Sequence, residues 1–151
     1  MTVEDRTVTI SMLMEPRHAN LHGGVHGGEI MYMMDVAAGC AAAKYARHNC
    51  VTAGVDEMRF FKPLKIGSFV TCTGTVAYTG NTSIELYVTI DAESLVGNNI
   101  EKHRAAEAFI TYVLVDDKGR PSPVTPFIPE TEQEKELYER VRARREKRRE
   151  K

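Results

Sequence analysis

This sequence has no run of apolar residues that approaches the roughly 20 consecutive positions a membrane-spanning helix requires. Its start carries Glu4 and Asp5 and no continuous apolar core, so it does not resemble a secretory signal peptide. Cysteine is scarce, and no two cysteines form a Cys-x-x-Cys pair. The pattern argues against a disulfide framework and indicates small buried thiols in a reducing compartment, at Cys40, Cys50 and Cys72. We therefore expect a cytoplasmic protein with no membrane partner.

Several motifs of catalysis and nucleotide binding are also missing. The chain has no Gly-x-Ser-x-Gly for a serine nucleophile, no Gly-Lys-Ser/Thr of a phosphate-binding loop and no His-Glu-x-x-His of a zinc enzyme. His18, His22 and His26 recur every four residues, a spacing that aligns metal ligands only on a helix. Glycines interrupt this stretch, so we expect no metal site. His22 or His26 is expected to line a pocket or to cap a turn.

The net charge of −1 hides a basic C-terminal end. From Glu139 onward there are eight Lys or Arg and three Glu residues, a local charge of +5. Such an arm suits an anionic partner, for example a nucleotide phosphate, but a solvated terminal helix explains the same pattern. Because the arm lacks interleaved aromatics and a helix-turn-helix partner, we expect no nucleic-acid binding.

Hydrophobic periodicity predicts the secondary structure. Alternating apolar residues predict strands over 8–14, 51–61, 68–78, 83–92 and 105–115. An apolar stripe at helical spacing predicts a helix over about 28–48, and a charged helix over 130–151 has only Leu137, Tyr138 and Val141 as a docking face. The length suits one domain, so we expect residues 1–129 to form it and residues 130–151 to form a basic helical tail.

The first predicted helix is apolar on nearly all sides and must be buried. The simplest packing is an α+β fold in which a curved antiparallel sheet wraps around this one long helix. That arrangement leaves free sheet edges and an uncovered flank of the helix. We therefore expect the chain to dimerise.

Asp35 is the exception on this helix. It lies about 110° round from the centre of the apolar stripe, beside small residues that include Gly28 and Gly39. The space next to it suits a ligand or a closely packed second helix. Burial of an unpaired carboxylate raises its pKa and favours a general base, whereas a purely structural aspartate would bond to backbone or to a neighbouring subunit.

A glycine-rich loop, Asn20 to Gly28, leads into the helix that carries Asp35. Free backbone N–H groups and the positive end of the helix dipole favour an anion or a developing oxyanion at such a helix start. Glycine also permits close approach of a substrate carbonyl. A simple tight turn is the alternative interpretation.

In combination, these features resemble a known family. The residues Asn20, Gly23, Gly27-Gly28 and Asp35 are followed by Val51-Thr52, Phe60-Phe61-Lys62-Pro63, Gly80-Asn81-Thr82-Ser83 and the arginine-rich end. Over nearly the whole chain this order is similar to the hotdog-fold acyl-CoA thioesterases of the broad-specificity cytosolic acyl-CoA hydrolase group. The resemblance implies hydrolysis of fatty acyl-CoA to acid and CoA, with no separate cofactor. It also implies dimers that pair into hexamers, with sites at the dimer interface.

The resemblance also implies roles for individual residues. Asp35 would be the general base or nucleophile, Asn20 of a facing subunit would orient water or the thioester, and the Gly27 or Gly28 amide would stabilise the oxyanion. Met31 and Met34 would line the acyl tunnel. The expected CoA-binding residues, for which ordinary surface positions are the alternative, are Gly80, Thr82, Ser83, Arg59, Lys62, Arg144, Arg145 and Arg148.

Two other functions fit parts of the pattern. A hotdog hydratase or dehydratase would pair His22 or His26 with Asp35. A non-catalytic acyl-CoA sensor would use the same pocket, with its basic tail contacting nucleic acid. Release of free thiol from acyl-CoA separates hydrolysis from both.

Overall fold

The computed structural model describes residues 5–98 and 101–150; Glu4 and Lys151, which figure in the sequence predictions, lie outside this range. The chain forms β1 (Thr7–Leu13), a short 3-10 helix (Pro16–His18), α1 (Gly27–Ala46) and β2 (Cys50–Phe60). It continues through β3 (Ser68–Thr79), β4 (Ser83–Ser94), β5 (His103–Leu114) and α2 (Glu132–Arg149). Every predicted strand and both predicted helices are present, with bounds shifted by at most two residues.

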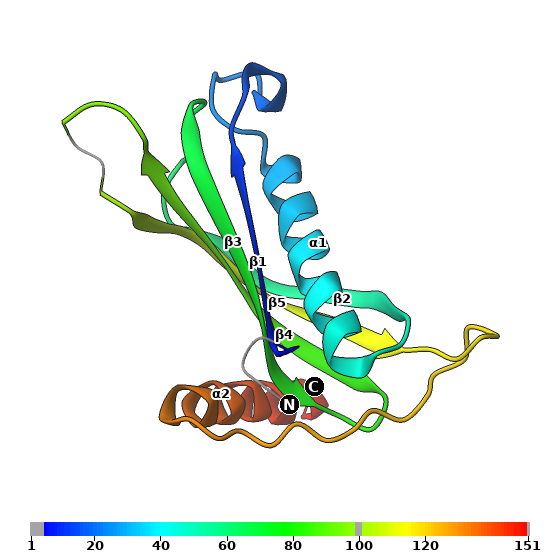
Figure 1. Cartoon of the computed structure of the whole chain (residues 1–151). Coiled ribbons are helices and arrows are strands. Elements are labelled where there is room, and N and C mark those ends of the chain that lie inside the picture. Colours follow the sequence, from blue (N-terminus) through cyan, green and yellow to red (C-terminus); the bar gives the residue numbers. More distant parts are fainter. Residues whose placement is uncertain (1–4, 99–100, 151) are drawn as a thin grey trace.

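The strands form one antiparallel sheet in the order β1-β3-β4-β5-β2, with α1 packed along one face (Figure 1). The apolar stripe of α1 is buried as predicted, from Ile30 through to Tyr45. It meets the alternate residues of β4 that face it, Ile84, Leu86, Val88 and Ile90, all of which are fully buried. The α+β architecture, with a sheet wrapped around one long helix, is therefore confirmed.

Small residues let α1 lie close to the centre of the sheet. A Cβ atom added to Gly74 of β3 would come within 3.1 Å of the backbone of Ala37 and Ala38. A side chain there would push the helix backbone away from the sheet, so glycine at this strand position and alanine on the helix allow the two layers to lie this close. The backbone of α1, and with it Asp35, is thereby fixed at a defined height above the sheet.

The C-terminal helix α2 packs on the opposite face of the sheet. Val141 is completely buried against Ala77 and Phe109, and the Tyr138 ring lies 4.8 Å from that of Tyr78 between centroids. The predicted docking face of Leu137, Tyr138 and Val141 is correct. A charged helix is thus held on the sheet by a narrow apolar stripe. Within the described residues, neither helix is long and apolar enough to span a membrane.

Strand β2 is an edge strand of irregular shape. Its register against β5 shifts between Thr52 and Gly54 and again between Asp56 and Arg59, where Glu57 has a φ of +46°. Such bulges bend a strand and redirect its side chains. Val51 and Val55 of this strand are about half exposed, at 50% and 46%. The edge next to α1 therefore offers apolar surface and unpaired backbone groups to a partner.

Candidate active site

Asp35 is anchored to the sheet by two hydroxyl groups. The Thr52 hydroxyl of β2 donates to Asp35 Oδ1 over 2.9 Å. The Tyr112 hydroxyl of β5 also bonds to Oδ1, and it lies 2.7 Å from the Asp35 backbone oxygen. Thr52 and Tyr112 are direct cross-strand neighbours in the β2–β5 ladder, so adjacent strands deliver both donors to one oxygen. Asp35 is therefore half-buried and paired, contrary to the expected buried, unpaired carboxylate.

The Tyr112 hydroxyl stays protonated and can donate its hydrogen bond to Asp35. Burial, together with the hydrogen bond to the Asp35 carboxylate, raises its pKa above that of an ordinary tyrosine. Because it does not ionise near neutral pH, it keeps its proton available to Asp35. The other carboxylate oxygen, Oδ2, accepts no hydrogen bond from any residue that the structure describes.

A mainly apolar cavity of about 300 Å³ opens between α1 and the β2–β5 edge beside Asp35. Its size is within the range of small-molecule sites. The predicted tunnel residues Met31 and Met34 both line it. The complete lining comprises Gly28, Met31, Tyr32, Met34, Asp35, Thr52, Val55, Met58, Ala108 and Ile110. The Asp35 carboxylate thus lies at the wall of a mainly apolar cavity.

The start of α1 distinguishes the two glycines proposed as oxyanion donors. His26 is the N-cap, and its Nδ1 accepts the Gly28 N–H over 3.0 Å, which confirms a capping role for this histidine. The Gly27 N–H has no acceptor within residues 5–98 and 101–150. An unpaired N–H at a helix N-terminus is the group that binds anionic oxygen. Gly27 therefore provides the free donor, whereas the Gly28 donor is occupied.

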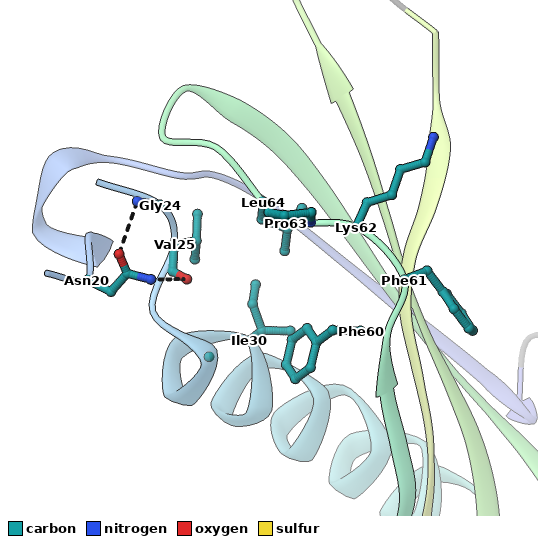
Figure 2. A pocket seen from close by; sticks show the side chains of 10 residues that line it. Asn20, Gly24, Val25, Ile30, Phe60, Phe61, Lys62, Pro63 and Leu64 are labelled. Atoms are coloured by element: carbon teal, nitrogen blue, oxygen red, sulfur yellow. Dashed lines mark hydrogen bonds between the residues drawn. The ribbon is translucent and has the colours of Figure 1, made fainter. Parts of the chain in front are cut away.

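Asn20 and Gly27 line a second cavity, of about 330 Å³, shown in Figure 2. Its lining comprises Asn20, Gly24, Val25, Gly27, Ile30, Phe60, Phe61, Lys62, Pro63 and Leu64. Asn20 Oδ1 accepts the N–H groups of His22 (2.8 Å) and Gly24 (3.1 Å), and its Nδ2 donates to the Val25 carbonyl. Asn20 therefore also shapes the loop that leads to the helix.

Asp35 is not a neighbour of this second cavity within one chain. Eight residues separate Gly27 from Asp35 along α1, a distance of about 12 Å. Asn20 and Gly27 share one cavity, while Asp35 lines the other. The predicted catalytic residues are thus divided into two groups within a single copy.

The residues predicted for CoA fall in four places, the last of which is α2. Lys62 lies in the cavity of Asn20 and Gly27, and Arg59 is exposed near the end of β2. Gly80 and Thr82 lie in the turn between β3 and β4, and Ser83 begins β4. This turn lies beside α2, where a Cβ on Gly80 would lie 3.0 Å from Arg145.

The α2 arginines are engaged by acidic residues of their own chain. Arg144 pairs with Asp56 at 2.9 Å and also with Glu57, while Arg145 pairs with Glu85 at 3.1 Å. Arg148 contacts Glu85 and Asp56. Glu85 is only 3% exposed, so Arg145 and Arg148 compensate its buried negative charge. These ion pairs, together with buried Val141, hold α2 on the sheet, and phosphate binding by its arginines stays a prediction.

The three loop histidines form no metal site in the described chain, which holds no cluster of three candidate ligands. His18 is buried, and its Nδ1 accepts the Glu15 N–H over 2.9 Å.

Sequence reasoning gave Thr52 and Tyr112 no role. Thr52 stood among the family-like residues, but Tyr112 sits in an alternating strand like any core tyrosine. Only the β2–β5 register shows that both reach Asp35.

Comparison with known proteins places this geometry in context. A family model described as the thioesterase superfamily matches residues 22–96. The cytosolic acyl coenzyme A thioester hydrolase of Mus musculus is 40% identical over 93% of this chain, although the chain spans only 38% of that relative. A Bacillus subtilis protein named as an uncharacterized acyl-CoA thioester hydrolase is 34% identical over 89% of this chain and 77% of the relative.

Solved structures agree in fold. An apo-hexameric acyl-CoA thioesterase superposes with a TM-score of 0.93 at 35% identity, covering 99% of this chain and 95% of its own. An acyl-CoA hydrolase of Staphylococcus aureus, solved with butyryl-CoA, CoA and CoA disulfide, gives 0.88 at 31% identity, with 97% and 88% covered. The predicted hotdog fold is confirmed by these likenesses.

The S. aureus protein has also been characterised as three alanine mutants, at an asparagine, an aspartate and a threonine. Its asparagine precedes the aspartate by 15 residues, and its threonine follows the aspartate by 17. Asn20, Asp35 and Thr52 have the same order and the same spacing here.

Proposed function

The chain belongs to the thioesterase superfamily, and from this premise we propose that it hydrolyses acyl-CoA thioesters to the free carboxylic acid and CoA. The observation that carries the proposal is the Asp35 carboxylate, held by two hydroxyls at the wall of an apolar cavity with its Oδ2 unbonded among the described residues. The names of the relatives support acyl-CoA as the substrate.

The proposed chemistry needs few groups. Asp35 either takes a proton from a water molecule that attacks the thioester carbon, or attacks that carbon itself through Oδ2 and is released by water. In both cases negative charge develops on the carbonyl oxygen, and the free Gly27 N–H at the positive end of α1 stabilises it. The carbon–sulfur bond then breaks, and the CoA thiolate takes up a proton.

We propose that the site is completed by a second copy of the chain. In one copy, Asp35 and the pair of Asn20 and Gly27 line different cavities, and Asp35 lies about 12 Å further along the helix than Gly27. An isologous dimer brings the Asn20–Gly27 cavity of each subunit to the Asp35 of the other. The exposed edge of β2 and the half-exposed Met31, Val51 and Val55 supply a surface for this contact. The hexameric structural neighbour supports further pairing of such dimers as a trimer.

For the CoA moiety we favour Lys62 and Arg59 over the α2 arginines. Lys62 lines the cavity of Gly27 and is exposed at its edge, where a flexible cation suits the diphosphate or 3′-phosphate. Arg144, Arg145 and Arg148 would have to leave carboxylate partners to bind phosphate. Gly80, Thr82 and Ser83 stay proposed contacts of the pantetheine and nucleotide channel. We propose a cytoplasmic location, supported by the cytosolic mammalian relatives, and no cofactor beyond CoA itself.

The wild-type protein tests this function. We expect it to release free CoA thiol from a panel of saturated acyl-CoAs from acetyl-CoA to palmitoyl-CoA, read with a thiol reagent. The chain-length profile would define the substrate class. If no thiol appears with any member, while a 2-enoyl-CoA is hydrated, the protein is a hydratase. Tight acyl-CoA binding with neither reaction would identify a sensor.

A further inference from the structure

Tyr112 lies near the C-terminal end of β5, next to the edge strand β2, and its hydroxyl contacts Asp35 of α1. Its side chain, from β5, is 2% exposed, and its hydroxyl contacts both the backbone oxygen and the Oδ1 of Asp35. In the sheet it stands between Thr52 on β2 and Ile84 on β4. No other tyrosine hydroxyl of the described chain bonds to an α1 carboxylate.

The small-residue flank of α1 gives this tyrosine its place. Gly39 lies one helical turn after Asp35, and a Cβ atom added there would lie 3.4 Å from the Tyr112 hydroxyl oxygen. The space beside Asp35, expected from the sequence to receive a ligand or a second helix, is thus filled at this point by the Tyr112 ring. The ring fixes the helix backbone at Asp35 as well as its side chain.

The consequence is that the two carboxylate oxygens of Asp35 are not equivalent. Oδ1 accepts two hydroxyl donors, from Thr52 and Tyr112, whereas Oδ2 accepts none from the described residues. A carboxylate rotates easily about its terminal bond when it is not held. Two donors from adjacent strands prevent that rotation and leave one defined oxygen for the substrate.

We propose that Tyr112 is a positioning residue of the thioesterase reaction, which holds Asp35 through Oδ1 so that Oδ2 alone meets the water or the thioester carbon. This inference rests on the proposed function. It adds a residue that neither touches the substrate nor lies among those lining the Asp35 cavity. Loss of a hydrogen bond to a charged group is expected to lower the rate about ten- to hundredfold if the bond is needed in the transition state.

Tyr112→Phe tests the inference because it removes only the hydroxyl and keeps the buried ring. We expect kcat to fall about ten- to hundredfold with KM changed less than about threefold, since the acyl and CoA contacts remain. A loss of kcat with KM nearly unchanged is the sign of a positioning role, because the carboxylate is then bound near the substrate but no longer held in its reactive orientation. A purely structural tyrosine would lower the melting temperature and leave kcat per folded oligomer unchanged.

Tyr87→Phe is the matched control. Tyr87 also donates its hydroxyl to a carboxylate within the sheet, that of Glu107, but on the face that carries α2. It should keep the wild-type kcat and KM. Thr52→Val, on the exposed edge strand, removes the other Oδ1 donor and should act in the same direction as Tyr112→Phe, while Thr52→Ser should restore the rate.

The possible results distinguish failure of the role proposed for Tyr112 from failure of the proposed acyl-CoA hydrolysis. An active wild type together with a Tyr112→Phe variant of unchanged kcat would overturn the role of Tyr112 and leave the hydrolase proposal intact. A wild type that releases no CoA would overturn both. If Tyr112→Phe is less stable, its kcat is measured per folded oligomer below its melting temperature, and an unchanged value there would equally overturn the inference.

Discussion

We expect Asp35→Asn to lower kcat for acyl-CoA hydrolysis by about 10²- to 10⁴-fold, the loss that follows removal of a general base. The amide has the size of the carboxylate and its oxygen can still accept the Thr52 and Tyr112 hydroxyls, so the packing of α1 is kept. It can neither take a proton from water nor attack the thioester as an anion. Steady-state thiol release with equal amounts of oligomeric protein measures the effect.

Asp117→Asn is the control for this change. Asp117 is exposed in the turn after β5, so the same chemical substitution there should leave kcat unaltered. A folded Asp35→Asn protein with wild-type turnover would remove Asp35 from the mechanism. In that case the carboxylate would be one that fixes the helix to β2 and β5 and does nothing else.

Gly27→Pro is expected to lower kcat by about 10²- to 10³-fold, the loss that follows removal of one oxyanion donor. Proline removes the N–H of residue 27, the free donor at the start of α1. The backbone accepts proline here because residue 27 is the first of the helix, where the proline φ fits. His26 before it is extended, with φ −64° and ψ 129°, the conformation that a residue preceding proline prefers.

Gly27→Ala separates the N–H from the missing side chain. Alanine keeps the donor, and its Cβ would lie 3.9 Å from the Phe60 ring, an ordinary contact. We expect turnover within a few-fold of wild type for Gly27→Ala and a large loss only for Gly27→Pro. Equal losses in the two variants would mean that space at residue 27 matters and its N–H does not, and the Gly28 amide would then have to be reconsidered.

The sequence was sufficient for the fold because each element has a clear period. The stripe on α1 and the alternation of β4 leave little choice of which faces are buried, and a helix apolar on nearly all sides needs a sheet around it. The docking face of α2 could also be predicted, because Leu137, Tyr138 and Val141 are the large apolar residues in an otherwise charged segment. The two shifts of register in β2 were not, because bulges depend on tertiary packing.

The site was predicted only in part, for a physical reason. Asp35 and the glycine-rich helix start are local features, visible as a charge on an apolar helix and as free amides before it. The anchoring by Thr52 and Tyr112 depends on which strands become neighbours, and the sequence pattern of β5 does not reveal that. The ion pairs of Arg145 and Arg148 likewise depend on the burial of Glu85, which appears in the sequence as one acidic residue in an alternating strand.

The most direct test of the shared site is subunit complementation between Asn20→Ala and Asp35→Asn. Each variant alone should be nearly inactive. When they are co-expressed with different tags, random pairing makes half of the dimers mixed, and each mixed dimer has one intact site and one doubly altered site, so about a quarter of wild-type activity should return. Mixed oligomers, purified through both tags, that stay as inactive as the parents would show that Asn20 and Asp35 act within one chain, and would contradict a site built from two copies.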